Sequence, residues 1–467
     1  MPGGMTRWSL VAVCATVPIA CVSVPSQPRP DPAATAQAFQ SRRLDRVLPD
    51  APSASDGWNR AQWLEAALRL NPTLAESRAR ATAVAAAERT AAQRPNPTLN
   101  LFGEYVAAAA GGVGWLYGLS LDFLLQRPGE RSRARESAAL ETQAAQSDVA
   151  ESIWQVRSDL RQALLDAVYA QDQGELLQQL LEDRQGLLNS AQARAQAGEI
   201  GPLEIARASV ELAAAQQRLD QARTRNLDAQ ARLAAAIGVP ASALDGVPLQ
   251  WSGWADIAAL SPAVSADERA DALIARPDLV RTLREYDLAD NALRGAVARR
   301  WPAFHIEPGY AWDKGGVREN QLNETLRDNE LGVSLELPLF NRNEGPIGEA
   351  LARRTLAGKH LEAVQAELFG QIERAERGWP RARDAWLNAT AVAATAQRQS
   401  EAEQRALEAG ASDRPSSLSA AAATVEAQLL RLEAAYEAQD ALGALESAYR
   451  RPLAGPEREL PLKWRTE

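Results

Sequence analysis

The stretch from Glu330 to Leu339, ELGVSLELPL, alternates between two kinds of side chain at every second position. Successive residues of a β-strand point to opposite faces, so one face collects Leu331, Val333, Leu335, Leu337 and Leu339 and the other collects Gly332, Ser334 and Glu336. An aliphatic face of this length is typical of strands that cross a membrane in a β-barrel, which need about 9 to 11 residues. A half-buried strand of a soluble sandwich is the alternative. The rest of the chain, however, predicts long helices and offers no soluble sheet to receive such a strand.

Three further segments repeat the alternation and predict strands at about 98–107, 115–125 and 303–313. The first is interrupted by Phe102, and the second follows a loop rich in glycine and alanine. With the strand at about 330–339, they form two hairpins.

Long helices occupy most of the remaining chain. Residues 129–197 contain no proline and predict a helix about 100 Å long at 1.5 Å per residue. Glycine and then Pro202 end it, and a return helix over 203–237 follows. A second long helix, expected over 349–407, contains Pro380, which should kink it. We expect this kink to accommodate neighbouring structure rather than to act as a gating hinge.

The chain is an internal duplication of helix, hairpin, long helix, turn and helix. Pro277 follows Pro72 by 205 residues, and the span of 42 residues from Gly198 to Pro240 recurs from Gly410 to Pro452. The predicted organisation is a signal peptide (1–20), a Pro-rich tether (21–57), a first repeat (58–240), an insert (241–267), a second repeat (268–452) and a C-terminal tail (453–467).

The N-terminus predicts export. Arg7 precedes an apolar run, and Pro18-Ile-Ala-Cys21 resembles the box at which bacterial lipoproteins are cleaved and lipidated on cysteine. Cleavage would remove Cys14 and leave Cys21 alone, so no intramolecular disulfide is expected. Val22, where an aspartate would signal retention in the inner membrane, favours the outer membrane. The prolines of the tether argue against any helix or core there.

Composition excludes several classes of function. The net charge of −9, with both signs interspersed, argues against a nucleic-acid groove. The sequence has no phosphate-binding glycine loop and no nucleophile elbow, so we expect no enzyme and no cofactor. His305 and His360 are the two histidines, neither lies in a cluster with metal-ligand spacing, and we expect no metal site.

Several motifs together resemble the TolC-type outer-membrane factors, the outer membrane efflux protein family. They are Arg94-Pro-Asn-Pro-Thr-Leu99, Leu335-Glu-Leu-Pro-Leu-Phe-Asn341 and the duplicated Ala-Gly turns. The segment Asn341-Arg-Asn-Glu-Gly-Pro-Ile-Gly348 is similar to the cation-efflux, CzcC-like branch. The resemblance rests on the order of these motifs and on the duplication, and it covers nearly the whole mature chain.

This resemblance implies a homotrimer, which a physical constraint also favours. Four strands leave open edges that hydrocarbon does not tolerate, and a barrel needs at least about eight strands. Two chains would supply eight and three would supply twelve; the family implies three. The expected fold is therefore a trimeric 12-stranded β-barrel continued into the periplasm by an α-helical barrel, with the insert and the tail around its middle.

The strand face opposite the lipid collects the candidate lumen residues Glu104, Asp122, Glu307, Asp313 and Glu336, with His305 as a polar wall residue. The predicted strands contain no Lys or Arg. One interpretation is an acidic lumen that favours cations over anions. The alternative is that any water-filled lumen is polar and that the excess of acidic residues is incidental.

The two sharp turns predict the periplasmic tip and the contact with an adaptor protein. The candidate residues there are Gly198, Glu199, Gly201, Glu204, Gly410, Asp413, Ser416 and Ser419. In relatives, acidic residues early in the second return helix narrow the mouth, whereas this chain has Pro415-Ser-Ser-Leu-Ser419. Glu204 and Asp413 would form rings only if they face inward.

The predicted function is a passive exit duct of a tripartite efflux system, in the bacterial outer membrane, lipid-anchored, with a periplasmic extension. The resemblance implies a periplasmic adaptor and an inner-membrane pump of the resistance-nodulation-division type as partners. Metal cations or drugs are the expected cargo. The alternatives are the exit duct of a type I protein secretion system and a periplasmic coiled-coil interaction protein without a channel.

The first prediction is that Cys21 is acylated in the mature protein. Mass spectrometry of the N-terminal peptide should find residue 21 as the first residue, carrying a mass increase for the lipid. An unmodified N-terminus at any other residue would contradict this.

Overall fold

The computed structural model describes residues 28–44, 58–107, 113–249, 251, 253–260, 262, 264–314 and 325–459, so Cys21 lies outside them. The chain forms two units, one ending at Arg42 and the other beginning at Arg43. The first contains a nine-residue helix, α1 (Pro32–Gln40). The prediction that the tether forms no helix is wrong here, because proline is well tolerated at the first helical position and Asp31 caps the N-terminus.

The second unit follows the duplicated order of elements. The first copy comprises α2 (Arg60–Leu70), α3 (Pro72–Ala91), β1 (Thr98–Ala107), β2 (Val113–Leu125), α4 (Glu130–Gln196) and α5 (Pro202–Ile237). Two short 3₁₀ helices, η3 (Ala241–Leu244) and η4 (Ile257–Ala259), lie in the insert. The second copy comprises α6 (Ala266–Ala275), α7 (Pro277–Ala298), β3 (Phe304–Lys314), β4 (Thr325–Leu335), α8 (Glu344–Glu408) and α9 (Arg414–Tyr449), and η5 (Pro456–Glu459) follows it.

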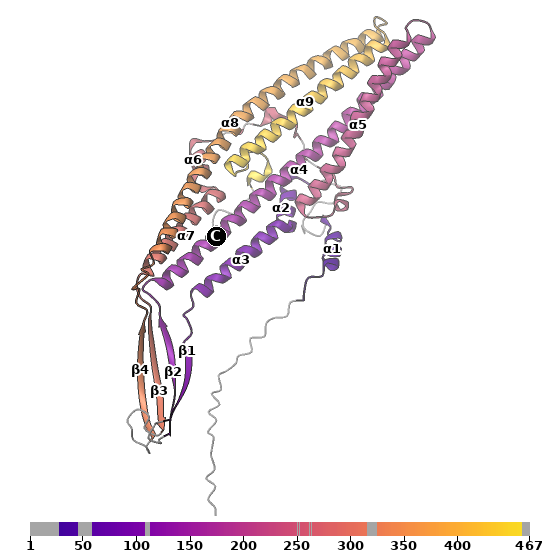
Figure 1. Ribbon diagram of the computed structural model, residues 1–467. Coiled ribbons are helices and arrows are strands. Elements are labelled where there is room, and N and C mark those ends of the chain that lie inside the picture. The colour runs from indigo at the N-terminus through magenta and orange to yellow at the C-terminus, as the bar shows by residue number, and fades with distance from the viewer. Residues whose placement is uncertain are drawn as a thin grey trace, which may run out of the picture. The chain divides into compact units, whose positions relative to one another are not determined.

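The long helices pack in antiparallel pairs. Helix α4 lies against α5 and α8 lies against α9, and α4 also contacts α9, so the two pairs run side by side (Figure 1). Helices α3 and α7 both lie against α4, and α7 also lies against α8. The paired helices match across the repeat, with 67 and 36 residues in the first copy and 65 and 36 in the second.

The four strands form one antiparallel sheet in the order β1-β2-β3-β4. Strand β1 has the predicted bounds, and β2 and β3 differ from the prediction by one or two residues at either end. Strand β4 was predicted at 330–339 but begins at Thr325 and ends at Leu335. Pro338 has no N–H to donate to a neighbouring strand, so Glu336 and the residues after it leave the sheet.

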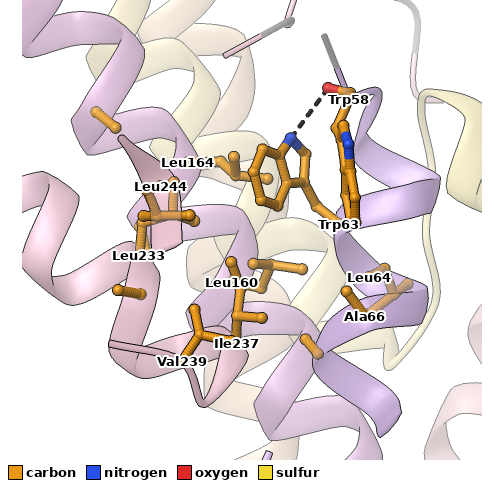
Figure 2. Packing of buried hydrophobic residues seen from close by; sticks show 14 of the residues in the cluster. Trp58, Trp63, Leu64, Ala66, Leu160, Leu164, Leu233, Ile237, Val239 and Leu244 are labelled. Carbon is orange, nitrogen blue, oxygen red and sulfur yellow. Dashed lines mark hydrogen bonds between the residues drawn. The ribbon is translucent and has the colours of Figure 1, made fainter. Parts of the chain in front are cut away.

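A tryptophan-rich cluster joins the first copy to the insert. Trp63 is fully buried, and its indole N–H donates to the carbonyl oxygen of Trp58 at 3.0 Å (Figure 2). Around them pack Leu64, Leu160, Leu164, Leu233, Ile237, Val239 and Leu244, from α2, α4, α5 and the residues that follow α5. The short helix α2 is thereby held against α4 and α5.

A second cluster joins the insert to the second copy. Trp254 and Ile257 of the insert pack with Trp379 and Trp386 of α8 and with apolar residues of α9. Pro380 follows Trp379 directly and lies inside α8, so the expected kink falls at the level of the insert. Toward the turns, by contrast, residues 189–214 and 394–419 contain no buried residue.

Candidate functional site

The sheet brings the predicted acidic residues onto one face. Glu104 pairs with Leu116, and Glu307 pairs with Gly332, which places both on the same face as Asp122. Asp313 holds a register position on this face, opposite Leu116, although its side chain is not described. Glu336, in contrast, lies one residue beyond the end of β4.

Two acidic residues were missed. Asp328 pairs with Ala311 and Glu330 pairs with Gly309, so both belong to the acidic face. Glu330 was the first residue of the predicted strand but was not counted among the lumen residues, and Asp328 was missed because β4 begins five residues before the predicted start.

The prediction that the strands contain no Lys or Arg is wrong for the same reason, since the observed bounds include Lys314 and Arg327. Arg327 pairs with Trp312 and Lys314 pairs with Trp115, which places both on the opposite, apolar face. The acidic face therefore carries no Lys or Arg over the part of the sheet that the structure describes.

The opposite face is apolar, with aromatic residues near the hairpin loops. Leu101, Leu119 and Val333 carry exposed side chains on this face. At the loop end, Tyr105 contacts Trp115 with ring centroids 4.8 Å apart, and three further aromatics, Tyr117, Tyr310 and Trp312, contact one another. A band of aliphatic residues ending in aromatic ones is typical of a lipid-facing surface that meets the membrane interface.

The side chains on the acidic face of β2 are less exposed than those on its apolar face. Along β2, Leu116 is 5% exposed while its neighbour Trp115 is 51% exposed. Phe102 contributes to the cover of the acidic face, because its ring fills the space above Gly118, where an added Cβ would lie 2.6 Å from the ring. This pairing also explains the interruption of the alternation at Phe102.

His305 and Asp122 form a pair on the acidic face. The Nδ1 atom of His305 lies 2.9 Å from a carboxylate oxygen of Asp122. The pairing of β2 with β3 is interrupted beside Asp122: Ser120 pairs with Gly309, and the next pair is Phe123 with Ile306. The histidine was expected to be a polar wall residue, and its hydrogen bond to a neighbouring wall residue agrees with that interpretation.

The two turns reverse the long helices through glycines. Gly198 and Gly410 adopt the left-handed conformation, with φ of 76° and 72°, and both lie in open space. Such a φ is readily available to glycine and strained for other residues. The predicted role of the two glycines in the reversals is confirmed. Glu199, Glu204, Ser416 and Ser419 are exposed, and Gly201 is partly covered.

The acidic residues at the turns have local partners. Asp413 caps α9 by accepting a hydrogen bond from the backbone N–H of Ser416 at 2.9 Å. Hydrogen bonds with Ser416 lower the pKa of the Asp413 carboxyl. Glu199 pairs with Arg194 at 3.1 Å. The Asp413 carboxylate therefore serves to start α9.

A buried ion cluster, which sequence reasoning missed, holds five elements together. Arg157 of α4 donates to Glu446 of α9 at 2.8 Å and to Glu457 of η5 at 2.9 Å. Glu457 also accepts from Arg60 of α2 at 2.9 Å, while Arg161 lies 3.2 Å from Glu446. The guanidinium of Arg60 stacks over the ring of Trp251 in the insert.

The charges in this cluster stabilise one another. Burial alone would raise the pKa of the Glu446 carboxyl, but Arg157 and Arg161 outweigh it and lower that pKa. Burial lowers the pKa of Arg161 to about 10, so it stays charged at neutral pH. Two backbone N–H groups, of Leu453 and Ala454, also donate to Glu446. The C-terminal segment is thereby fixed at the level of the insert.

The described residues also bear on metals and membranes. They contain no group of three or more His, Cys, Asp or Glu residues arranged to hold a metal ion. They also contain no helix that is both long and apolar enough to span a bilayer.

An antiparallel sheet with one apolar face and one acidic face joins helices of 67 and 65 residues, each packed against a shorter helix. Residues 63–239 and 269–449 match the family described as Outer membrane efflux protein. The chain therefore belongs to this family. The match leaves out the whole insert, 241–267, which agrees with the two repeats seen in the fold.

Solved structures show the same fold. The outer-membrane channel OprN matches with a TM-score of 0.69 at 18% identity, covering 91% of this chain and 98% of that one. CusC, described as forming a transmembrane channel, matches with a TM-score of 0.67 at 16% identity, covering 91% and 98%. The outer membrane protein VceC from Vibrio cholerae matches with a TM-score of 0.65 at 16% identity, covering 85% and 99%. No curated protein sequence matches the chain.

The second prediction tests the two faces of the sheet. Val333→Arg should prevent assembly in membranes, because Val333 lies between Leu331 and Leu335 in the aliphatic band of β4 and an arginine at a lipid-facing midplane position costs about 2 to 4 kcal/mol. Leu335 is the last residue of β4, and an arginine near the interface costs only about 0 to 1 kcal/mol. Ser334→Asp, one residue away on the acidic face, should assemble normally. Membrane fractionation followed by gel electrophoresis without heating measures both variants, and equal assembly would show that the faces are assigned wrongly.

The third prediction concerns the ion cluster. Glu446→Gln should cost about 3 to 5 kcal/mol at neutral pH, because it leaves the buried Arg161 without a carboxylate partner and Arg157 with Glu457 alone. The lowered pKa of Glu446 means that its contribution is present above the unfolded-state pKa and is lost as pH falls through the folded-state pKa. The stability difference between wild type and variant should therefore shrink on acidification.

Thermal unfolding followed by circular dichroism measures this difference. Glu426→Gln is the matched control, because Glu426 lies on the same helix and pairs with Arg218 at 2.9 Å but is exposed. An exposed pair contributes about 0 to 1 kcal/mol. Equal destabilisation by the two substitutions would contradict the role given to the buried cluster.

Proposed function

We propose that this protein is the outer-membrane exit duct of a tripartite efflux system. The observation that carries the proposal is the sheet: its apolar face suits lipid, its acidic face suits water, and its strands continue into helices long enough to reach across a periplasm. The duct is passive and catalyses nothing. Energy comes from an inner-membrane pump of the resistance-nodulation-division type through a periplasmic adaptor.

The assembled duct is a homotrimer with a 12-stranded barrel. Strands β1 and β4 are the edges of the sheet and pair on one side only. Three copies, joined β4 to β1, close the barrel and satisfy the edges. The absence of buried residues along 189–214 and 394–419 supports this, because these helix faces remain available to neighbouring copies and partners.

The lumen selects for cations. Glu104, Asp122, Glu307 and Glu330 share one face, and three copies of this face would line the channel with carboxylates. Together with the resemblance of residues 341–348 to the cation-efflux branch, this charge favours metal cations or cationic drugs as cargo. The cargo passes through without a dedicated binding site.

Two other functions receive less support. A coiled-coil interaction protein would have no use for a sheet with a lipid-type face. An exit duct for secreted polypeptide would share the fold, but an acidic lumen does not specifically favour a polypeptide.

We further propose that Cys21 anchors each chain to the inner leaflet of the outer membrane.

The adaptor docks at the two turns, which form the periplasmic mouth. They are the reversals of the long helices, and their glycines allow helix pairs to end close together. The exposed residues Glu199, Glu204, Ser416 and Ser419 lie beside these glycines. The residues proposed for the contact thus cluster at the ends of the two helix pairs.

The fourth prediction tests this placement. Replacing Gly198 and Gly410 together with valine should abolish adaptor capture and export, because valine is strained at their positive φ. The trimer should still form and conduct ions in planar bilayers. Export is measured as cargo retained in cells that express the pump and the adaptor.

Gly174→Val with Gly370→Val is the matched control, because both glycines lie in open space inside the long helices without a positive φ. This control should export normally. Normal export by the Gly198/Gly410 variant would show that the mouth is placed wrongly. A wild-type protein that gives no conductance would instead overturn the duct itself.

A further inference from the structure

The topology places four connecting segments at one edge of the sheet. Strands β1 and β3 begin there, and β2 and β4 end there, because neighbouring strands are antiparallel. The connections to the helices at this edge are residues 92–97, 126–129, 299–303 and 336–343, and we take them together with the first six residues of α4, 130–135, and the first residue of α8, Glu344. We call them the junction collar.

The junction collar is basic in an acidic protein. It contains eight arginines and three glutamates, an excess of five positive charges, while the whole chain carries −9. The arginines are Arg94, Arg127, Arg131, Arg133, Arg135, Arg299, Arg300 and Arg342, and the glutamates are Glu130, Glu336 and Glu344. This local charge favours an anionic partner.

Three of the arginines shape the collar by binding carbonyl oxygens. The Nε of Arg127 donates to the carbonyl of Trp301 at 2.7 Å, which ties the β2–α4 connection to the start of β3. Arg131 donates to the carbonyl of Ala92 at 2.7 and 3.0 Å, which ties α4 to the end of α3. Arg133 binds the nearby carbonyl of Pro128. The connections are thus held together independently of any ligand.

The other five arginines are available. Arg94, Arg135, Arg299, Arg300 and Arg342 are exposed, and none of them pairs with a carboxylate among the residues that the structure describes. Four of them come from three of the connections, and Arg135 is the sixth residue of α4, which follows the fourth connection, so exposed guanidinium groups are spread along the edge.

Large apolar side chains are exposed beside them. Trp301 is 70% exposed, Leu339 is 71% exposed and Phe340 is fully exposed. Leu337 and Leu339 continue the alternation of Leu335, on the lipid-type face of β4, past the end of the strand. The collar therefore offers cations and apolar groups side by side, directly next to the apolar face of the sheet.

We infer that the junction collar binds anionic phospholipid headgroups of the leaflet that faces the helices. The guanidinium groups would donate to phosphodiester oxygens, and Trp301, Leu337, Leu339 and Phe340 would enter the acyl region. This rests on the proposed placement of the sheet in the outer membrane. Anionic cell-wall polymer would match the charges, but it offers no acyl chains for the apolar groups.

The test is lipid retention by the purified trimer in detergent. Wild type and a variant with Arg299→Gln, Arg300→Gln and Arg342→Gln are titrated with dioleoylphosphatidylglycerol or dioleoylphosphatidylcholine, and bound lipid is counted by native mass spectrometry. Wild type should prefer phosphatidylglycerol. The variant should lose at least about tenfold in apparent affinity for it, since each arginine near an anionic surface raises the affinity severalfold. Binding of phosphatidylcholine should stay unchanged.

Two further variants separate a lipid site from other roles. Arg381→Gln, Arg398→Gln and Arg405→Gln remove the same charge from exposed positions on α8 and should retain the wild-type preference. Lysines in place of Arg299, Arg300 and Arg342 should restore most of it, since the charge remains. Equal retention of phosphatidylglycerol by wild type and the junction variant would overturn the inference. Dissociation of the junction variant into monomers would also overturn it, by assigning the collar to contacts between copies. Neither result bears on the conductance of the wild-type trimer, which tests the proposed duct separately.

Discussion

The unpaired edges of the four-stranded sheet constrain the rest of this structure. The outer edges of β1 and β4 carry backbone N–H and C=O groups that no described strand of the same chain satisfies. In hydrocarbon each such group costs several kcal/mol, so a sheet with this lipid-type face requires partners of its own kind. Since one chain supplies fewer strands than a closed barrel needs, the protein is incomplete as a monomer in its proposed environment.

The helices adjoin the strands at one edge of the sheet and are held to one another at the level of the insert. Each of the four strands connects to a helix at the junction collar. The apolar clusters around Trp63 and Trp379, with the ion cluster of Arg157 and Glu446, fix the pairs at the level of the insert. Farther toward the turns little is buried, which leaves those surfaces to other chains.

The sequence alone predicted most local features, because each has a local signal. Alternation located three strands closely, and Gly-Pro punctuation located the reversals at Gly198 and Gly410. It failed for the start of β4, because Arg327 and Asn329 lie on the apolar face near the loops and break the alternation there. The ion cluster was invisible for another reason: Arg60 and Glu457 are 397 residues apart, and no local pattern relates them. The acidic lumen face was therefore predicted in part, without Asp328 and Glu330.

Disulfide cross-linking of the strand edges tests closure between copies most directly. One cysteine at Leu101 of β1 would be combined with single cysteines at successive positions from Asn329 to Leu335 of β4, and the membranes oxidised before electrophoresis without reductant. Closure through β4 and β1 predicts that at least one combination gives covalent dimers and trimers and nothing larger. Chains that remain monomeric at every position, or that form open-ended polymers, would contradict the closed trimeric barrel.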